Sequence, residues 1–332
     1  MSKEESVYVV PFSHLDLYWA GAREECLSRG GHIISTALDL LERYPGYRFT
    51  IEAVNFMDYY LDAFPEELER IKKLLQSGQL EIIPMRSITY TQLPSGETLV
   101  RNLLYGREFC LKKFGIDPKI ITMSDIPGIS PQMPQIALLA GMNALVLSHG
   151  CPPHTDHIKY HALDGRGIDA YAPPHYGRCF HFLADGRSYD EMLEKEPAFE
   201  AAFGAVDYKQ LCQLGVDLCV ITEGFLNDII RWNEEGHRKI NFTTYREFFD
   251  KHIPPITDRI SGEIPCLWPN VESSWPDLWP LDLPCENAMF NTEFFSALNI
   301  LQGRDGVPAE QFKTAWNWLL KAANMQRRST AC

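Results

Sequence analysis

The sequence lacks the cysteine spacing of a zinc ribbon or a redox site. Its 332 residues include nine cysteines, an odd number, and no Cys-x-x-Cys pair occurs. Reduced thiols in a reducing compartment are the simplest interpretation of this usage. The N-terminus, Met-Ser-Lys-Glu-Glu-Ser, is polar and acidic and does not have the pattern of a signal peptide. We therefore expect a cytoplasmic protein.

Positive charge and long apolar runs are also scarce. The chain has 31 Lys and Arg against 44 Asp and Glu, which gives a formal net charge of −13. This balance argues against nucleic acid or an anionic membrane surface as a partner. No apolar run reaches the ~18 residues that a membrane helix needs. A neutral ligand fits the charge balance, and the 7 Trp, 14 Tyr and 18 Phe include the kind of ring that lines sugar-binding clefts.

What the sequence does have is a regular alternation of expected strands and helices. Strands are expected at 7–11, 48–53, 80–85, 119–123 and 144–148, with helices at 33–44, 65–76, 98–114 and 131–140 between them. This order is typical of a parallel α/β fold. Further along, the pattern indicates a long loop or hairpin at 150–205, a sixth strand at 218–222, and two amphipathic helices at 286–302 and 309–325.

The end of the first strand carries two side chains of the metal-ligand type. His14 and Asp16 follow Pro11 and lie two positions apart, so an extended chain points both side chains to one side. Imidazole nitrogen and carboxylate oxygen both suit zinc. The alternative is a solvated loop in which His14 and Asp16 only hydrogen-bond each other. The spacing alone leaves both interpretations open.

A third candidate ligand ends the fourth expected strand. Asp125 precedes a Pro-Gly turn and a helix, where an isolated aspartate would be interpreted as an N-cap. If the first and fourth strands lie close in one sheet, His14, Asp16 and Asp125 converge at the carboxyl ends of the strands. Active sites of parallel α/β folds gather there. Three such ligands with an open fourth position are typical of a catalytic metal site.

Five segments, in order, resemble one known family. His14-Leu-Asp16 with Trp19 resembles the His-x-Asp-x-x-Trp opening motif of the glycoside hydrolase family 38 α-mannosidases. Four later segments resemble, in turn, that family's helix after the third strand, its nucleophile segment, its Asp-Gly-Ser turn at the sugar site and the end of its catalytic domain. These segments are 95–106, 124–135, 162–165 and 232–249.

The resemblance implies an α/β fold: a distorted (β/α)7 barrel of the glycoside hydrolase/deacetylase type, followed by the start of a helical bundle. It divides the chain into a barrel at 1–260, a linker at 261–285 and a partial bundle at 286–332. It also implies a zinc-dependent retaining α-mannosidase, with Zn²⁺ or another divalent metal on His14, Asp16 and Asp125. The expected partner is a mannose-containing glycan.

The same resemblance assigns roles to single residues. Asp125 would be the nucleophile as well as a metal ligand, and Trp19 would form the stacking floor under the sugar. Asp164 would line the sugar site. His149, which follows the fifth expected strand, is a further candidate for substrate binding. A retaining glycosidase also needs a second carboxyl group as its acid/base.

The acid/base is the first departure from the family pattern. The family's aspartate lies just after the sixth strand in a Gly-x-Asp setting. If 218–222 is that strand, no aspartate occupies the expected position. Glu223 is then the nearest candidate by position and Asp228 by residue type. For each of them, a capping or solvated carboxylate is the alternative to the acid/base role.

The second departure is the fourth zinc ligand. In the family it is the histidine of a His-Asp pair after a bundle helix, and this sequence has no such pair. We expect a truncated chain whose unfinished bundle exposes an apolar face and self-associates. Two other functions stay open: a metal-dependent carbohydrate deacetylase, which would use the same three ligands, and a catalytically inactive remnant that binds sugar or metal.

Overall fold

The computed structural model describes residues 6–126, 128–147, 156–174, 176, 188–203, 210–265 and 279–322. Its strands are β1 (Val7–Ser13), β2 (Phe49–Ile51), β3 (Leu80–Ile82), β4 (Ile120–Met123), β5 (Ala144–Leu147), β6 (His157–His161), β7 (Gly167–Tyr171), β8 (Gln210–Leu214), β9 (Ile240–Phe242) and β10 (Asp258–Ser261). Its α-helices are α1 (Arg23–Arg43), α2 (Val54–Ala63), α3 (Leu68–Gln76), α4 (Gly96–Phe114), α5 (Met133–Leu139), α7 (Tyr189–Phe203), α8 (Glu223–Glu234), α9 (Tyr245–Lys251), α10 (Trp279–Leu301) and α11 (Ala309–Ala322).

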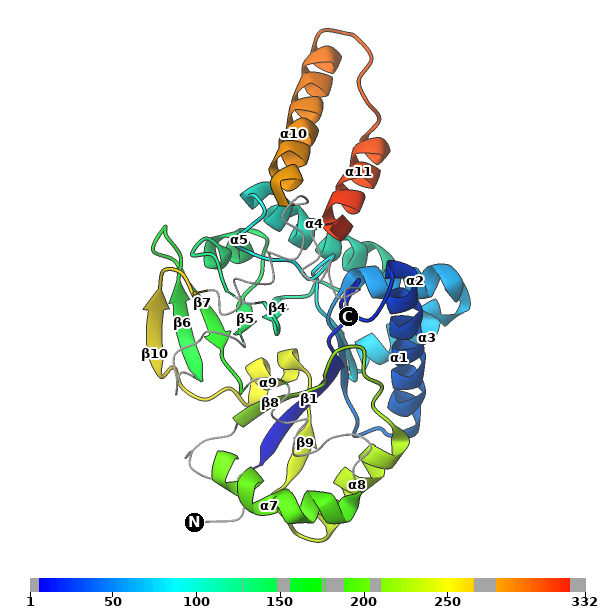
Figure 1. The fold of residues 1–332 in the computed structure, drawn as a ribbon, viewed down its shortest axis with the longest axis vertical. Helices are drawn as coiled ribbons and strands as arrows, with labels where there is room; N and C mark the ends of the chain where they lie inside the picture. The colour runs from blue at the N-terminus through cyan, green and yellow to red at the C-terminus, as the bar shows by residue number, and fades with distance from the viewer. Residues whose placement is uncertain are drawn as a thin grey trace.

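The described strands form two sheets, and most of their pairs are parallel. One sheet has the order β3-β2-β1-β8, with β9 also paired to β1, and the other has the order β10-β6-β7-β5-β4. The pair β6–β7 is antiparallel. Helices α1, α2 and α3 cover one side of the first sheet, as Figure 1 shows. The α/β fold predicted from the sequence is confirmed.

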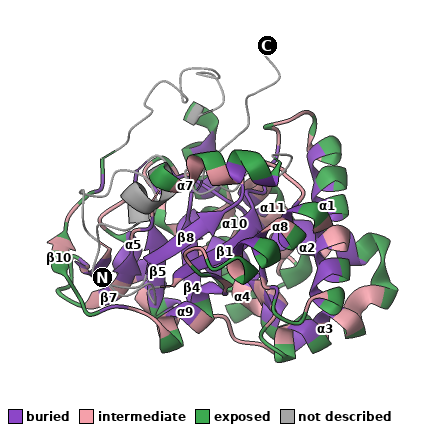
Figure 2. Cartoon of the chain, turned by 90° about the horizontal axis from the view of Figure 1, so that it is seen from below, coloured by how far each residue is buried: buried purple, intermediate pink, exposed green. Residues whose placement is uncertain are grey.

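β1 is the most heavily paired strand of the described chain. Residues Val7–Pro11 pair with β8, Val7–Val9 pair with β9, and Phe12 and Ser13 pair with β2. All seven of its residues are buried, and Figure 2 shows β1 and β8 in the buried interior. A strand buried on both faces reads as a continuous apolar run, which is why the sequence revealed it.

The sixth strand is the main correction to the sequence prediction. Residues 218–222 are not a strand, and β8 lies earlier, at Gln210–Leu214. The error arose because β8 contains two glutamines, which a buried strand seldom tolerates. The Gln213 amide is buried and donates hydrogen bonds to Ser124 Oγ and Tyr245 Oη. Partners inside the protein make the polar residue acceptable there.

Three smaller differences concern helices. The sequence pattern missed α2, which starts directly after β2. The hairpin expected within 150–205 is present as β6 and β7, but the same stretch also contains α7. α10 begins at Trp279, inside the expected linker at 261–285. The proposed domain boundaries themselves stay a prediction.

α10 and α11 form a hairpin that projects from the rest of the chain, as Figure 1 shows. Arg101 of α4 holds the hairpin by two hydrogen bonds to Glu293 of α10, at 2.9 and 2.6 Å. The guanidinium also stacks 4.5 Å above the ring of Trp316, on α11. The exposed large apolar side chains of α10 are Leu281, Leu283, Phe290, Phe294, Phe295, Leu298, Ile300 and Leu301. None of the described helices is long and apolar enough to cross a membrane.

The exposed apolar side chains of α10 predict self-association. We expect the mass measured by static light scattering to rise with protein concentration, because the association buries apolar surface. Phe295→Lys should weaken this rise, since it places a charge within the apolar group. Leu139→Lys changes an exposed leucine on α5 and serves as the control. A monodisperse monomer at every concentration would contradict the prediction.

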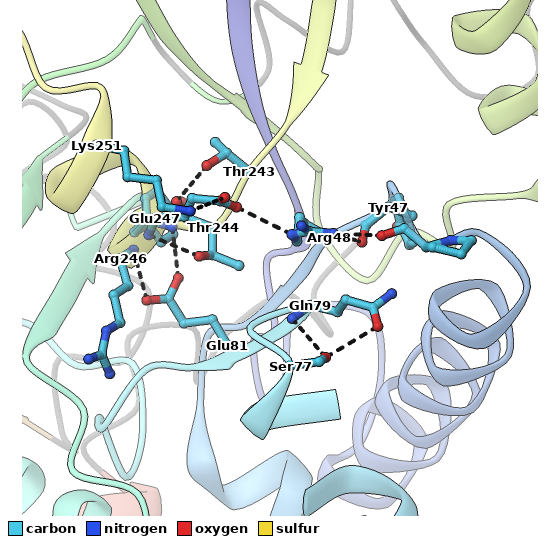
Figure 3. Close-up of polar contacts among 12 residues, drawn as sticks. Tyr47, Arg48, Ser77, Gln79, Glu81, Thr243, Thr244, Arg246, Glu247 and Lys251 are labelled. Carbon is cyan, nitrogen blue, oxygen red and sulfur yellow. Dashed lines mark hydrogen bonds and ion pairs between the residues drawn. The ribbon is translucent and has the colours of Figure 1, made fainter. Parts of the chain in front are cut away.

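Glu81 of β3 connects this strand to the start of α9. Its carboxylate accepts hydrogen bonds from the backbone N–H groups of Tyr245 (2.8 Å) and Arg246 (3.1 Å), at the start of α9. The hydroxyl of Thr50 donates a third, at 3.3 Å, and Figure 3 shows the carboxylate facing α9. Burial raises the pKa of Glu81 to about 7, because it disfavours the ionised form more than these hydrogen bonds favour it.

The raised pKa of Glu81 predicts a pH dependence of stability. Between the ordinary pKa of 4.5 and the raised value of about 7, the folded state binds a proton that the unfolded state releases. The contribution of Glu81 is therefore present at low pH and is lost as the pH rises through 7. We expect the unfolding free energy of the wild type, relative to Glu81→Gln, to fall between about pH 5 and pH 7.5 in denaturant titrations. Glu69→Gln, which changes an exposed residue of α3, is the control. Equal pH profiles for wild type and Glu81→Gln would refute the raised pKa of Glu81.

Candidate metal and active site

The carboxyl ends of β1 and β8 bring the first site residues together. His14 forms a parallel bridge with Asp217, in which its N–H donates to the Val216 carbonyl at 3.1 Å and its carbonyl accepts from Leu218 N–H at 2.9 Å. Gly215 makes this approach possible, because a Cβ there would lie 2.3 Å from the carbonyl oxygen of Phe12. The backbone of β1 thus fixes where Asp217 sits relative to His14.

His14 is the centre of a buried group of carboxylates. Its Nε2 lies 3.0 Å from Oδ2 of Asp16 and 3.7 Å from Oδ2 of Asp125. Its Nδ1 lies 2.7 Å from Oε2 of Glu52, whose other oxygen accepts a 3.3 Å hydrogen bond from Thr122. With Nδ1 directed at Glu52, Nε2 is the nitrogen that faces the two aspartates. His14, Asp16 and Asp125 therefore converge as predicted, although β1 and β4 belong to different sheets rather than to one.

The buried group has the features of a metal site. One ligand atom from each of His14, Asp16 and Asp125 can be chosen so that all three lie within 4.8 Å of one another. His14 Nε2 and both carboxylate oxygens of Asp16 are buried, and none of them makes a well-aligned hydrogen bond with a described residue, although Nε2 and Oδ2 of Asp16 lie 3.0 Å apart. Buried polar atoms without partners are costly, and a cation between them would satisfy all three. These residues can hold a metal, and a nitrogen and two carboxylates fit a divalent ion of the zinc type.

The charges around His14 also favour a cation. Burial opposes protonation of the imidazole, but Asp16 and Glu52 outweigh it and raise the pKa of His14 well above its ordinary value. Burial likewise raises the pKa of Asp16 to about 6, against the lowering effect of His14. The His14 shift comes from the neighbouring carboxylates, whereas the Asp16 shift comes chiefly from burial, with smaller contributions from Asp125 and Asp217. A bound cation would compensate the charge of these carboxylates.

Asp217 and Tyr176 complete the group. The Tyr176 hydroxyl donates a 3.2 Å hydrogen bond to Asp217 Oδ1, and its ring stacks on the His14 imidazole with a centroid distance of 5.7 Å. Burial raises the pKa of Asp217, His14 lowers it, and the neighbouring Asp125 raises it again. The two aspartates therefore interact electrostatically, and Asp217 holds a proton at higher pH than an ordinary aspartate does.

Backbone strain occurs beside both strand ends. Tyr18 (φ 69°) and Leu218 (φ 48°) are the non-glycine residues with positive φ in the described part of the chain. Tyr18 follows Asp16 by two positions, and Leu218 directly follows Asp217. Such a conformation costs of order 1–3 kcal/mol, and residues that adopt it cluster at functional sites.

The predicted substrate-binding residues are Trp19, Asp164 and His149. Trp19 lies in the segment after β1 with its side chain 41% exposed, so its ring is accessible. Asp164 lies in the β6–β7 turn, where it accepts hydrogen bonds from Arg166. Because β7 is parallel to β5, that turn lies at the amino end of the strands, away from His14. His149 lies outside the described residues.

The two predicted acid/base candidates lie on α8. Glu223 is half exposed and binds Arg43 at 2.6 Å and the Tyr44 hydroxyl at 2.8 Å, at the end of α1. Asp228 lies on the same helix and is partly buried. The expectation that no aspartate follows the sixth strand is wrong, because Gly215-Val216-Asp217 follows β8 directly. The structure brings Asp217, rather than Glu223, to the His14 group.

Sequence reasoning missed Glu52, Tyr176 and Asp217. Glu52 lies near the carboxyl end of the expected second strand, 48–53, and a carboxylate at that position was the available sign of a site residue. Asp217 could have been found from its Gly-x-Asp setting if β8 had been placed correctly. Tyr176 had no local signal, because it reaches the site from a stretch that the sequence indicated only as irregular.

The α/β fold thus gathers acidic residues and a histidine at the carboxyl ends of parallel strands, where the active sites of such folds lie. Residues 4–258 match the glycosyl hydrolases family 38 N-terminal domain. The chain therefore belongs to glycosyl hydrolase family 38, as its motifs indicated.

Several curated relatives of the chain are named as α-mannosidases. It is 28% identical over 177 residues to an alpha-mannosidase of Saccharomyces cerevisiae, which covers 51% of this chain and 16% of that protein. It is 27% identical over 182 residues to alpha-mannosidase 2C1 of Homo sapiens, which covers 52% of this chain and 17% of that protein. The chain thus matches less than a fifth of the length of these relatives.

Solved structures confirm the fold class. An alpha-mannosidase from Enterococcus faecalis superposes with a TM-score of 0.79 and 20% identity, over 98% of this chain and 39% of that one. A 4-alpha-glucanotransferase from Thermococcus litoralis superposes with a TM-score of 0.59 and 16% identity, over 96% of this chain and 50% of that one. The fold is the α/β fold of the glycoside hydrolase/deacetylase type.

The contact between Glu52 and His14 leads to a prediction about metal affinity. Because Glu52 holds the imidazole of His14, Glu52→Gln should weaken metal binding by about 10–100-fold without removing a ligand atom. Titration of the metal-free protein with Zn²⁺ in a calorimeter measures this change. Glu81→Gln, whose carboxylate bonds Thr50 and the start of α9 rather than the His14 group, is the control. Equal zinc affinity in wild type and Glu52→Gln would contradict the role given to Glu52.

Proposed function

We propose that the chain is the catalytic region of a zinc-dependent, retaining α-mannosidase-type glycoside hydrolase. The observation that carries this proposal is the convergence of His14, Asp16 and Asp125 with Asp217 at one end of a family 38 fold. The set contains what the reaction needs: a cation site, a carboxylate that borders it, and a second carboxyl that holds a proton.

His14, Asp16 and Asp125 would hold Zn²⁺, with another divalent metal as the alternative. The donor set, and its buried atoms that lack a well-aligned hydrogen bond, support this assignment. When bound, the cation supplies positive charge that keeps Asp125 ionised and attracts sugar hydroxyls. Glu52 keeps the imidazole oriented with Nε2 towards the aspartates.

Asp125 is the proposed nucleophile. Its carboxylate oxygen forms a bond to the anomeric carbon of the mannoside as the bond from that carbon to the leaving oxygen breaks. The side chain of Asp125 is 14% exposed, against 0% for His14. It is therefore the member of the ligand set with the most direct access to a substrate.

Asp217 is the proposed acid/base. Its raised pKa, caused by burial and by Asp125, favours the protonated form that donates to the leaving oxygen. The resulting carboxylate then accepts a proton from water as the water oxygen attacks the anomeric carbon and releases Asp125. The hydrogen bond from Tyr176 fixes one oxygen of Asp217 and leaves the other for the reaction.

The proposed substrate is an α-mannoside. The names of the relatives in yeast and human support it, as does the exposed Trp19, three positions after Asp16 in the chain, whose ring would offer a sugar a stacking surface. The sugar would lie between Trp19 and the His14 group.

Kinetics of the acid/base variant test the proposal. Asp217→Asn should reduce turnover of a mannoside with a poor leaving group, such as methyl α-mannoside, by about 10²–10⁴-fold. A dinitrophenyl α-mannoside needs no proton for departure, so formation of its covalent intermediate should be much less affected. Glu223→Gln, on the exposed face of α8, should leave both rates near wild type.

Other outcomes of these assays distinguish the alternatives. Loss of activity in Glu223→Gln with normal activity in Asp217→Asn would overturn the assignment. Release of acetate from an N-acetyl sugar with no cleavage of mannosides would indicate a deacetylase. Zinc bound in stoichiometric amount without either reaction would indicate a binding protein.

A further inference from the structure

A second, basic pocket lies on the outside of the fold, where α2, α4 and α11 meet. Its volume is about 230 Å³, and its lining residues are Asp58, Arg86, Tyr105, Phe109, Lys112, Lys113, Lys313 and Asn317. Figure 1 shows the end of α11 beside α4 in this part of the chain. No residue of the His14 group lines it.

Positive charge exceeds negative charge around this pocket. Its lining contains four cationic side chains and one carboxylate, Asp58. Glu108 lies beside the lining and pairs with Lys112 and with Lys313, the latter at 3.0 Å. Lys113 has no ionic partner among the described residues. An excess of cations at one place is unexpected in a chain whose net charge is −13.

Arg86 is the buried member of the cluster. Its side chain is 8% exposed, and one terminal nitrogen lies 2.5 Å from Asp58. Its Nε is buried and has no hydrogen-bond partner in the described part of the chain. The guanidinium also lies 5.9 Å from the ring of Phe109. A single carboxylate therefore satisfies only part of a group that has five donors.

The positive charges near the pocket also affect the neighbouring Lys321. Burial lowers its pKa, and the charges of Arg86 and Arg23 lower it further, against the smaller opposing effects of Asp58 and Asp62. The charges of Arg86 and Arg23 thus act on Lys321, although burial is the larger cause of its lowered pKa.

We propose that this pocket binds a small oxyanion of the phosphate class, either free phosphate or the phosphate group of a small molecule. Arginine and lysine together are the usual partners of phosphate oxygens. The volume is below the ~300–1,000 Å³ of typical ligand pockets, so it suits a tetrahedral anion with a small attached group and excludes a polymer. The rings of Tyr105 and Phe109 give such a group an apolar wall.

A bound anion would connect the projecting hairpin to the barrel. Arg86 follows β3, Lys113 belongs to α4, and Lys313 belongs to α11. An oxyanion shared by these cations would add a further link beside those that the pairs Arg101–Glu293 and Lys313–Glu108 already form. Binding should therefore stabilise the folded chain and protect α11 from hydrogen exchange.

Calorimetric titration with inorganic phosphate, at constant ionic strength maintained with chloride, tests the proposal. Lys113→Ala and Lys313→Ala each remove one cation from a half-buried or exposed position, so the fold should persist. Each should weaken phosphate binding by about tenfold or more, the value of one charge-assisted hydrogen bond. Lys73→Ala, an exposed lysine of α3 outside the pocket, is the matched control and should bind as the wild type does.

The possible results distinguish a phosphorylated small molecule from free phosphate, and both from the absence of a specific site. Tighter binding of mannose 6-phosphate than of phosphate, with none of mannose, would identify a phosphorylated small molecule as the ligand. Equal binding of the two anions would identify free phosphate. No phosphate binding to the wild type, or equal loss in Lys73→Ala, would overturn the proposal. The measurement requires no turnover, so it is independent of the function proposed for the His14 group.

Discussion

The backbone hydrogen bonds between β1 and β8 determine the geometry of the candidate site. The register runs from Val7 opposite Gln210 to Pro11 opposite Leu214 and continues to the bridge between His14 and Asp217. A slip by one residue would turn every side chain of a strand to the other face. Both strands are fully buried, so such a slip is strongly disfavoured. The strand with the most pairing partners in the described chain therefore fixes the positions of the site groups.

The electrostatics of the site follow from this placement. Asp16, Glu52, Asp125 and Asp217 surround one imidazole in a volume with little water. In such surroundings like charges repel strongly, and only a proton or a cation can compensate them. The same groups therefore destabilise the folded chain when they are unliganded and make it selective for positive ions. Metal binding and folding stability are coupled at this position.

Much of this arrangement was predictable from the sequence, because the informative residues lie next to apolar strands. His14 and Asp16 follow the continuous apolar run of β1, and Asp125 follows that of β4. Asp217 was missed because the two glutamines interrupt the apolar pattern of β8, the strand that Asp217 follows. The hydrogen-bond partners that make these glutamines acceptable lie far away in the sequence. The basic pocket was not predictable, since Arg86, Lys113 and Lys313 lie on three elements that meet only in the folded chain. Sequence patterns indicate local structure, whereas such contacts depend on tertiary packing.

The left-handed backbone of Tyr18 and Leu218 has a consequence for engineering. Each residue adopts a conformation that glycine tolerates better, and each adjoins a carboxylate of the site. A library selected only for resistance to heat should therefore accumulate glycine or asparagine at these two positions. The same replacements would loosen the segments that hold Asp16 and Asp217. Thermal robustness and catalytic competence would then diverge, and Tyr18 and Leu218 are the positions where a designer would first have to choose between them.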